Sequence, residues 1–347
     1  MIVKDYVVNP EMSIIDAMRH IDKNARGIVY VCAEDGSLLG GVTDGDIRRH
    51  IIKGGPVEAA VSGIMKQNPI TLPPARRGEA ADVMKLRSVR SIPIVDEDNR
   101  ILEIIFQDSP TAYASAAINV PVVIMAGGKG MRLMPYTQIL PKPLIPIGEK
   151  TITEHIIDRF AAAGCRDFCM IVNYKKHFIE SYFKDMELTI NLEFVEEENY
   201  LGTAGGLTLL KHKYNDSFFM SNCDILIEGD YSKMLSYHKE SKNLATIVCA
   251  LKNTQLPYGV VESSEDGAVI KINEKPRISS IVNTGLYVLE PEFLEQIPEN
   301  KFIHITEVMQ NCIGKGMRIG MYPVSEDRWM DMGQISELEK MTARLTS

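Results

Sequence analysis

The sequence of 347 residues is short of the residues that build metal centres and disulfide frameworks. Its six cysteines are scattered and form no C-x-x-C pair, and its seven histidines are equally dispersed. Structural zinc sites need clustered cysteine and histidine ligands, and small disulfide-bonded scaffolds need cysteine at high density. We therefore expect free thiols in a reducing cytoplasm, and no zinc site.

The sequence also lacks long apolar runs and any excess of positive charge. No uninterrupted apolar stretch approaches the length of a membrane span, and the first residues do not have the pattern of a signal peptide. Lys and Arg number 38 against 46 Asp and Glu, which gives a net charge of −8 with no basic block. Because nucleic-acid backbones bind basic surfaces, we expect neither a nucleic-acid nor a membrane partner.

Residues 1–115 contain a degenerate internal duplication. Each copy reads as a helix, a strand, an acidic turn and a second strand; the first copy opens at Ser13 and the second at Ala81. The length suits two or three domains. We expect domains over residues 1–54, 55–115 and 116–347, with the segment 108–119 as a linker.

The order of elements in the duplication, with the phrase IMKQNPIT at residues 64–71, resembles a tandem pair of CBS domains. Such pairs form a compact module that binds adenine or other nucleotides and tends to dimerise. The resemblance implies a regulatory nucleotide and a homo-oligomer, either a dimer or a tetramer. It gives Thr43 and Asp46 contacts with phosphate and ribose, whereas the second copy has Phe106 and Ser109 at these positions. We therefore expect at most one nucleotide site per module.

Asp46 also has a purely structural interpretation. An aspartate often caps the N-terminus of a helix by accepting backbone hydrogen bonds, and a helix is expected to begin at Ile47. Both interpretations are compatible with the sequence.

A glycine-rich loop near the start of the third domain carries the strongest local signal. The apolar run at residues 122–125 predicts a buried parallel strand. It leads into GGKG at residues 127–130, where missing Cβ atoms let backbone N–H groups surround an anion. Arg132 and Lys142 follow. Two cations beside this loop predict a triphosphate site, although neither the Walker A nor the dinucleotide-binding pattern is present.

The full string GGxGxRLxPxT…PKPLxP resembles the signature of the sugar-phosphate nucleotidyltransferases, which join a nucleoside triphosphate to a sugar 1-phosphate. The resemblance implies an α/β fold with a Rossmann-like (GT-A-like) mixed sheet behind the CBS module. The alternation of strands and helices also favours a doubly wound sheet, with ligands at the carboxyl ends of its strands. The resemblance further implies catalytic roles for Arg132, Lys142 and Lys275, and nucleotide binding by Ala126, Gly127, Gly128, Gly130 and Met131.

The segment EEENYLGTAGG, residues 196–206, resembles the base-recognition segment of this family and includes Gly202 and Thr203. Glu197 falls where uridylyl and thymidylyl members tend to have glutamine. A carboxylate only accepts hydrogen bonds, and guanine presents two donors on one edge, so Glu197 favours GTP. A slip of the alignment among the three glutamates, or an ordinary solvated acidic run, are the alternatives.

Two aspartates are the candidate ligands of Mg²⁺. Asp224 follows a buried strand, at the edge of the sheet where a magnesium ligand is expected, although it could instead cap a turn. Asp331 lies in WMDMG, which resembles the W-x-D-x-G motif that supplies the family's second carboxylate. The resemblance implies that the two aspartates together hold Mg²⁺.

Three further segments resemble the sugar-phosphate side of the family's site: YGVVE at residues 258–262, NEKP at 273–276 and NTGLY at 283–287. They imply a sugar-phosphate site built by Gly259, Glu274, Lys275, Asn283 and Thr284. If these segments did not follow the same order as in the family, Glu274 and Lys275 would be interpreted as an ordinary exposed pair at the end of a strand.

A CBS pair ahead of a domain expected to use GTP resembles the guanylyltransferases that activate glucosamine 1-phosphate for bacterial legionaminic acid synthesis. The expected reaction transfers a nucleotidyl group from GTP to a sugar 1-phosphate and releases pyrophosphate. One alternative is an enzyme that uses CTP or UTP. Another is a non-catalytic sensor of nucleotides or nucleotide sugars.

Overall fold

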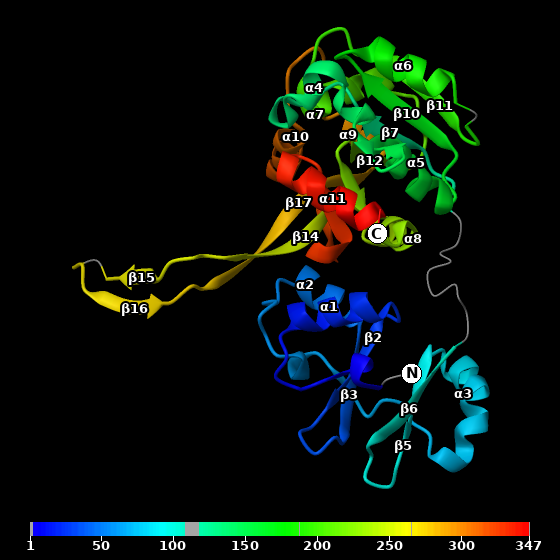
Figure 1. The fold of residues 1–347 in the computed structure, drawn as a ribbon, viewed down its shortest axis with the longest axis vertical. Helices are drawn as coiled ribbons and strands as arrows, with labels where there is room; N and C mark the ends of the chain where they lie inside the picture. Colours follow the sequence, from blue (N-terminus) through cyan, green and yellow to red (C-terminus); the bar gives the residue numbers. More distant parts are fainter. Residues whose placement is uncertain (1–2, 108–117, 187, 265, 347) are drawn as a thin grey trace. The chain divides into compact units, whose positions relative to one another are not determined.

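The structure is a computed structural model that describes residues 3–107, 118–186, 188–264 and 266–346. The expected linker over residues 108–119 lies outside these ranges except for its last two residues. The chain forms two compact units (Figure 1). The first comprises Met1–Ala112 and Leu251–Ile281, and the second comprises Tyr113–Ala250 and Val282–Ser347.

The first unit contains the duplicated module, with the helix–strand–strand order predicted for each copy. The first copy consists of α1 (Ile14–Asn24), β2 (Ile28–Cys32), β3 (Leu38–Thr43) and α2 (Asp44–Ile52), and the second of α3 (Ala80–Arg87), β5 (Ser91–Val95) and β6 (Ile101–Phe106). The short strands β1 (Val7–Val8) and β4 (Lys66–Gln67) complete a four-stranded sheet in the order β1-β2-β3-β4, while β5 pairs with β6. Ser13 caps α1 through its hydroxyl, as residues of this type commonly do.

The two copies share a hydrophobic core. Tyr30 and Leu38 of the first copy pack with Ile104 and Phe106 of the second. The hydroxyl of Tyr30 lies 2.8 Å from that of Ser91, so a hydrogen bond also joins the two copies. This shared core and the hydrogen bond join the two copies in one module.

The rest of the first unit is a two-stranded hairpin. Its strands β15 (Val260–Ser263) and β16 (Val269–Asn273) are antiparallel, with Val261 opposite Ile272 and Glu262 opposite Lys271. The hairpin lies in the chain between β14 (Ala245–Gln255) and β17 (Arg277–Leu289), which join it to the sheet of the second unit.

A seven-stranded mixed sheet forms the centre of the second unit, as expected. Its order is β11-β10-β7-β12-β17-β14-β18, in which β11, β10, β7 and β12 are parallel and β17 runs antiparallel to β12. The strands not yet given bounds are β7 (Val122–Met125), β10 (Asp167–Val172), β11 (Asn191–Glu196), β12 (Phe218–Asn222) and β18 (Ile319–Ser325).

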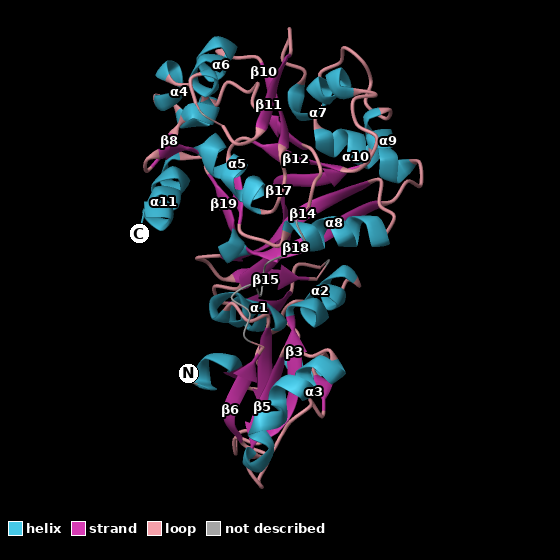
Figure 2. Ribbon diagram, turned by 90° about the vertical axis from the view of Figure 1, so that its right-hand side faces the viewer, coloured by secondary structure: helices cyan, strands magenta, loops and turns pink. Residues whose placement is uncertain are grey.

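Helices cover both faces of this sheet (Figure 2). Because strand side chains alternate, Val122 and Ile124 of β7 enter one core and Val123 enters the other. The first core is closed by α5 (Ile152–Ala162), α6 (Lys176–Lys184), α8 (Tyr231–Glu240) and α11 (Ile335–Thr346), and the second by α7 (Gly202–Gly205), α9 (Pro291–Leu294) and α10 (Ile305–Gly314). No helix within the described ranges is long and apolar enough to cross a membrane.

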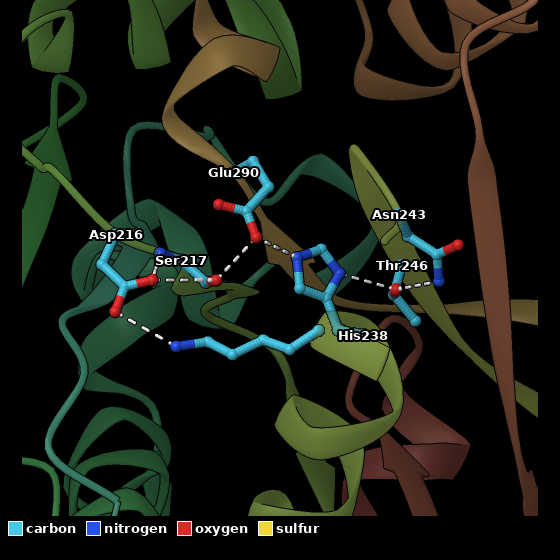
Figure 3. A network of polar contacts seen from close by, with 7 residues as sticks. Asp216, Ser217, His238, Asn243, Thr246 and Glu290 are labelled. Carbon is cyan, nitrogen blue, oxygen red and sulfur yellow. Dashed lines mark hydrogen bonds and ion pairs between the residues drawn. The ribbon is translucent and has the colours of Figure 1, made fainter. Parts of the chain in front are cut away.

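A buried polar network joins α8 to β14 and to the end of β17 (Figure 3). His238 of α8 has no exposed surface. Its Nε2 lies 2.9 Å from Oε1 of Glu290, and its Nδ1 lies 2.8 Å from the hydroxyl of Thr246. Asn243 donates to the same hydroxyl at 2.9 Å, and Ser217 donates to Glu290 at 2.7 Å.

These partners suit a neutral imidazole. Nε2–H donates to the carboxylate, and Nδ1 accepts from Thr246, whose oxygen in turn accepts from Asn243. A proton on Nδ1 would leave the Thr246 hydroxyl without this acceptor. Burial is the main reason that the pKa of His238 is lowered; Lys239 lowers it further, while Glu290 and Asp216 oppose the shift.

We expect His238 to make the second unit less stable in mild acid. Below the ordinary histidine pKa, the unfolded chain takes up a proton that the folded network excludes, so stability falls as the pH decreases from about 7.5 to about 5.5. Thermal unfolding followed by circular dichroism across this range, for the wild type and His238→Gln, measures the effect. The variant should lose part of the pH dependence; identical pH profiles would contradict this role.

Candidate active site

The glycine-rich loop leaves the carboxyl end of β7 and is held by Thr137 of α4 (Tyr136–Ile139). Gly130 has a φ of +64°, and a Cβ there would come within 2.8 Å of Cγ2 of Thr137. The Thr137 hydroxyl donates to the carbonyl oxygen of Gly130 at 3.0 Å. Glycine at position 130 thus permits both the backbone conformation and this close packing.

Lys142 and Asp224 meet beside the loop. The ammonium group of Lys142 forms an ion pair with Oδ2 of Asp224, and both side chains are largely buried. Burial alone would lower the pKa of Lys142, but the negative charges of Asp224 and Asp331 raise it, so the ammonium form is stabilised.

Strand pairing brings the second predicted aspartate to the first. The short strands β13 (Ile225–Ile227) and β19 (Trp329–Asp331) are antiparallel, with Ile225 opposite Asp331. The N–H of Met332 donates to the carbonyl oxygen of Asp224 at 2.8 Å. Burial and the charge of Asp224 raise the pKa of Asp331, while the N–H of Gly333, at 2.7 Å, and the charges of Lys142 and Arg132 oppose the shift.

These two carboxylates have the chemistry that a Mg²⁺ site needs, because hard divalent cations prefer oxygen ligands. Burial, and after it the charge of Asp224, raise the pKa of Asp331, and a bound cation would favour its ionised form. Within the described ranges, no group of three or more His, Cys, Asp or Glu side chains could hold a metal ion. A magnesium ion bound by Asp224 and Asp331 would need its other ligands from substrate phosphates or water.

Glu197 lies at another side of the same loop. Its side chain is only 3% exposed, and its Oε1 accepts the N–H of Leu201 at 2.8 Å. Its Oε2 is 3.0 Å from the point where a Cβ on Gly127 would stand. Burial raises the pKa of Glu197, and the hydrogen bond from Leu201 partly offsets that effect. The carboxylate therefore keeps acceptor capacity next to the glycine-rich loop.

These groups surround a cavity of about 510 Å³. Most of the residues predicted for phosphate, base and metal binding line it, namely Gly127, Gly128, Gly130, Met131, Arg132, Lys142, Glu197, Gly202, Thr203 and Asp224. Asp331 adjoins the cavity through its hydrogen bond to Gly333, which is also a lining residue. Segments far apart in the sequence thus contribute to one concave site.

Three other predicted site residues, Ala126, Asn283 and Thr284, make hydrogen bonds to other residues of the protein. Ala126 is fully buried, and its N–H donates to Ile171 of β10 at 2.8 Å. The hydroxyl of Thr284 donates to the carbonyl oxygen of Val248 at 2.7 Å. The side chain of Asn283 donates to the Tyr287 hydroxyl and accepts the Gly285 N–H. Substrate contacts of Asn283 and Thr284 stay predictions.

The remaining sugar-phosphate candidates lie together on the hairpin of the first unit. A Cβ on Gly259 would come within 2.9 Å of Oε2 of Glu274, so these two residues are neighbours. Glu274 and Lys275 occupy the turn between β16 and β17, and Lys275 has a φ of +46°. Their roles also stay predictions.

The cavity has further lining residues that the sequence motifs did not single out. Lys129 adds a third cation inside the glycine-rich loop, and Tyr200 precedes the LGTAGG segment. Asn222 and Cys223 come directly before Asp224. Burial raises the pKa of Cys223 to about 12, so this thiol is protonated at neutral pH. Proximity in sequence to a motif is the only signal that could have indicated these residues.

In the duplicated module, Thr43 and Asp46 form a reciprocal cap of α2. The Thr43 hydroxyl and N–H both donate to Oδ2 of Asp46, while the Asp46 N–H donates back to Thr43. The helix therefore begins at Asp44 with Thr43 as its cap, and the suggestion that Asp46 caps a helix starting at Ile47 is wrong.

The other oxygen of Asp46 bonds Arg49 at 2.5 Å and lies 3.5 Å from Lys66. Burial would raise the pKa of Asp46, but its hydrogen bonds and the Lys66 charge lower it. A ribose bound by Thr43 and Asp46 would compete with these contacts, and that binding stays a prediction.

Comparison with known proteins gives the family. A model described as nucleotidyl transferase matches residues 121–347, which include all of the cavity lining. The chain belongs to the nucleotidyl transferase family. The CBS domain model matches residues 1–53 and 61–107, so CBS domains precede the nucleotidyl transferase region.

Curated relatives match a little under two thirds of the chain. A mannose-1-phosphate guanylyltransferase of Mycobacterium tuberculosis is 30% identical over 236 residues, which are 66% of this chain and 66% of the relative. A UTP–glucose-1-phosphate uridylyltransferase of Synechocystis is 29% identical over 236 residues, or 62% of this chain and 60% of the relative. The chain thus spans less than two thirds of the length of these relatives.

Solved structures share the fold. HddC from Yersinia pseudotuberculosis matches with a TM-score of 0.51 and 24% identity, covering 65% of this chain and 99% of HddC. The same protein complexed with GMP-PN matches with a TM-score of 0.51 and 22% identity over the same shares.

Thr137→Val should loosen the glycine-rich loop. The substitution keeps the shape of the side chain but removes the donor to Gly130, at a cost of about 1 kcal/mol. We expect weaker binding of inorganic pyrophosphate, measured by calorimetry, with a small loss of thermal stability. Thr137→Ser retains the donor and should bind like the wild type; equal binding by all three proteins would show that this hydrogen bond does not shape the loop.

Proposed function

We propose that the chain is a sugar-1-phosphate nucleotidyltransferase that uses GTP and transfers its guanylyl group to glucosamine 1-phosphate or a related sugar. One observation carries the proposal. A single cavity brings the glycine-rich loop, Arg132 and Lys142 together with Asp224 and with the buried carboxylate of Glu197. The cations suit a polyphosphate, and the carboxylates suit a divalent cation and a base edge.

In the proposed reaction, an oxygen of the sugar 1-phosphate forms a bond to the α-phosphorus of the triphosphate. The bond from that phosphorus to the bridging oxygen breaks, and pyrophosphate leaves with the electron pair. Because the attacking oxygen is already an anion, the chain needs no general base. The protein contributes position and charge stabilisation, as in other phosphoryl transfers.

The predicted site residues divide these tasks. Arg132 and the N–H groups of the loop hold the phosphates that depart, and Lys142 stabilises the phosphates that react. Lys275 would bind the phosphate of the sugar. Asp224 and Asp331 would hold Mg²⁺, which supplies charge stabilisation at the phosphate oxygens when it is bound.

Glu197 supports GTP as the nucleotide. Its carboxylate can accept both donors on the guanine edge, whereas uracil and thymine present one donor and one acceptor. Several relatives are named mannose-1-phosphate guanylyltransferases, and HddC is known in complex with GMP-PN. Glucosamine 1-phosphate rests on the resemblance of the domain combination to the enzymes of legionaminic acid synthesis.

Two other functions are weaker candidates. One is an enzyme that uses UTP or CTP in place of GTP, and a relative named uridylyltransferase supports UTP as the alternative nucleotide. A non-catalytic sensor is disfavoured because Arg132, Lys142, Asp224 and Asp331 are all present. We propose that the CBS pair binds a regulatory nucleotide or mediates assembly into a dimer or tetramer.

Pyrophosphate release tests the proposed reaction. Each of GTP, UTP, CTP, dTTP and ATP is paired with glucosamine 1-phosphate and other sugar 1-phosphates, with Mg²⁺ or with EDTA. We expect release with GTP that EDTA abolishes. Release with a pyrimidine alone would retain the reaction class and reject GTP, whereas silence across the panel with intact GTP binding would favour the sensor.

An active-site variant and a matched control make this test specific. Asp224→Asn should lower turnover by at least about a hundredfold, because the carboxylate is lost at the metal site. Asp158→Asn is the control, because Asp158 also pairs with a lysine, Lys150, but both side chains are about half exposed. Turnover near the wild-type rate in the Asp224 variant would reject the assignment.

Glu197→Gln should change the nucleotide preference. The amide provides one donor and one acceptor, which fit uracil and mismatch guanine. We expect kcat/KM for GTP to fall by about tenfold or more, because a mismatched buried polar group is left without a partner, and the UTP value to rise relative to it. The ratio of the two kcat/KM values is the measurement. An unchanged ratio would mean that another residue reads the base.

A further inference from the structure

An aromatic cluster stands at the rim of the nucleotide cavity. Tyr200 lines the cavity and is 41% exposed. Its ring packs edge-on against Phe302, with centroids 5.9 Å apart and planes at 66°. Phe302 is 53% exposed and packs edge-on against His304, with centroids 5.0 Å apart and planes at 80°. Edge-to-face packing of this kind fixes the rings relative to one another.

Backbone pairing holds the two loops that carry these rings. Leu201 accepts the Ile303 N–H at 2.9 Å, and the Ala204 N–H donates to Ile303 at 3.2 Å. Gly202, with a φ of +85°, permits this approach, because a Cβ there would lie 2.5 Å from the Ile303 carbonyl oxygen. The hydroxyl of Thr203 adds a hydrogen bond from the Ile305 N–H at 3.0 Å. These hydrogen bonds therefore fix the two loops that carry the rings relative to each other.

The loop that carries Tyr200 is also hydrogen-bonded to Glu197, the residue proposed to bind the edge of the base. The residue after Tyr200 donates its N–H to Glu197, so the tyrosine and the carboxylate lie on one short, hydrogen-bonded turn. Burial and the charge of Glu197 raise the pKa of Tyr200, and the charge of Lys142 opposes that rise. Tyr200 is thus within electrostatic range of Glu197, which faces the expected base, and of Lys142, which faces the expected phosphates.

We infer that Tyr200 is a stacking platform for the base of the bound nucleotide and that Phe302 positions its ring. Glu197 would read the edge of the base while Tyr200 covers its face. An aromatic face binds any base, and a purine covers more of the ring than a pyrimidine does. The inference depends on the proposed function for the identity of the ligand, and it adds a specificity-determining residue to that site.

Binding and kinetics of three Tyr200 variants test the inference. Tyr200→Phe keeps the aromatic face, Tyr200→Leu keeps apolar volume without it, and Tyr200→Ala removes both. We expect the Leu and Ala variants to bind GDP about tenfold more weakly in calorimetry, since a base–aromatic stack is lost. The KM for GTP should rise by a similar factor, with kcat and the KM for sugar 1-phosphate little changed, and CDP binding should be less affected. The Phe variant should match the wild type.

Two further variants separate positioning from general damage. Phe302→Leu removes the ring that packs against Tyr200 and should weaken GDP binding by about threefold, with kcat unchanged. Phe178→Ala, at a ring that is 57% exposed and does not line the cavity, should bind GDP normally.

Particular outcomes would overturn the inference. They are wild-type GDP binding by Tyr200→Leu, equal losses in the Phe and Leu variants, and a rise confined to the KM for sugar 1-phosphate. A wild type that binds GDP but turns over no nucleotide would reject the proposed function, while the same binding series would still support or overturn the stack.

Discussion

The candidate active site depends on one cluster of compensated charge, formed by Lys142, Asp224 and Asp331. A largely buried charge without a partner is costly, and the two aspartates raise the pKa of the lysine while the lysine opposes the rise in Asp331. The pairing of β13 with β19 fixes the two carboxylates, and the turn after Pro141 fixes the lysine. Removing one member of the cluster leaves the others with charge that the fold no longer balances.

The same constraint explains why the site lies at this edge of the sheet. The parallel strands β7 and β12 are neighbours in register, so the glycine-rich loop and Asp224 leave the sheet at adjacent carboxyl ends. At this edge, backbone N–H groups, two cations and two carboxylates can converge without disturbing the cores on either face of the sheet. The charged site and the apolar layers are therefore compatible within one small unit.

Features set by local sequence were predictable. The apolar runs indicated strands in both units, and the run of glycines at residues 127–130 indicated the loop. Features that depend on distant partners were not. The hydroxyl of Thr284 is bound by Val248, and the capping of α2 by Thr43 rather than Asp46 depends on the backbone at the end of β3. Tyr200 lies inside the EEENYLGTAGG segment but was given no role there, because its packing partner Phe302 comes about a hundred residues later in the chain.

In the proposed site, Glu197 binds the edge of the base and Tyr200 stacks on its face, so these two side chains must keep fixed positions relative to each other. Glu197 bonds the backbone of Leu201, and Leu201 pairs with Ile303, so a shift of either loop moves the carboxylate and the aromatic rings together. Gly202 allows the two loops to approach this closely, and any larger residue there would meet the Ile303 carbonyl oxygen. Gly202 offers no side chain to the nucleotide of the proposed site. It instead sets the distance between the loop that carries Glu197 and Tyr200 and the loop that carries Phe302.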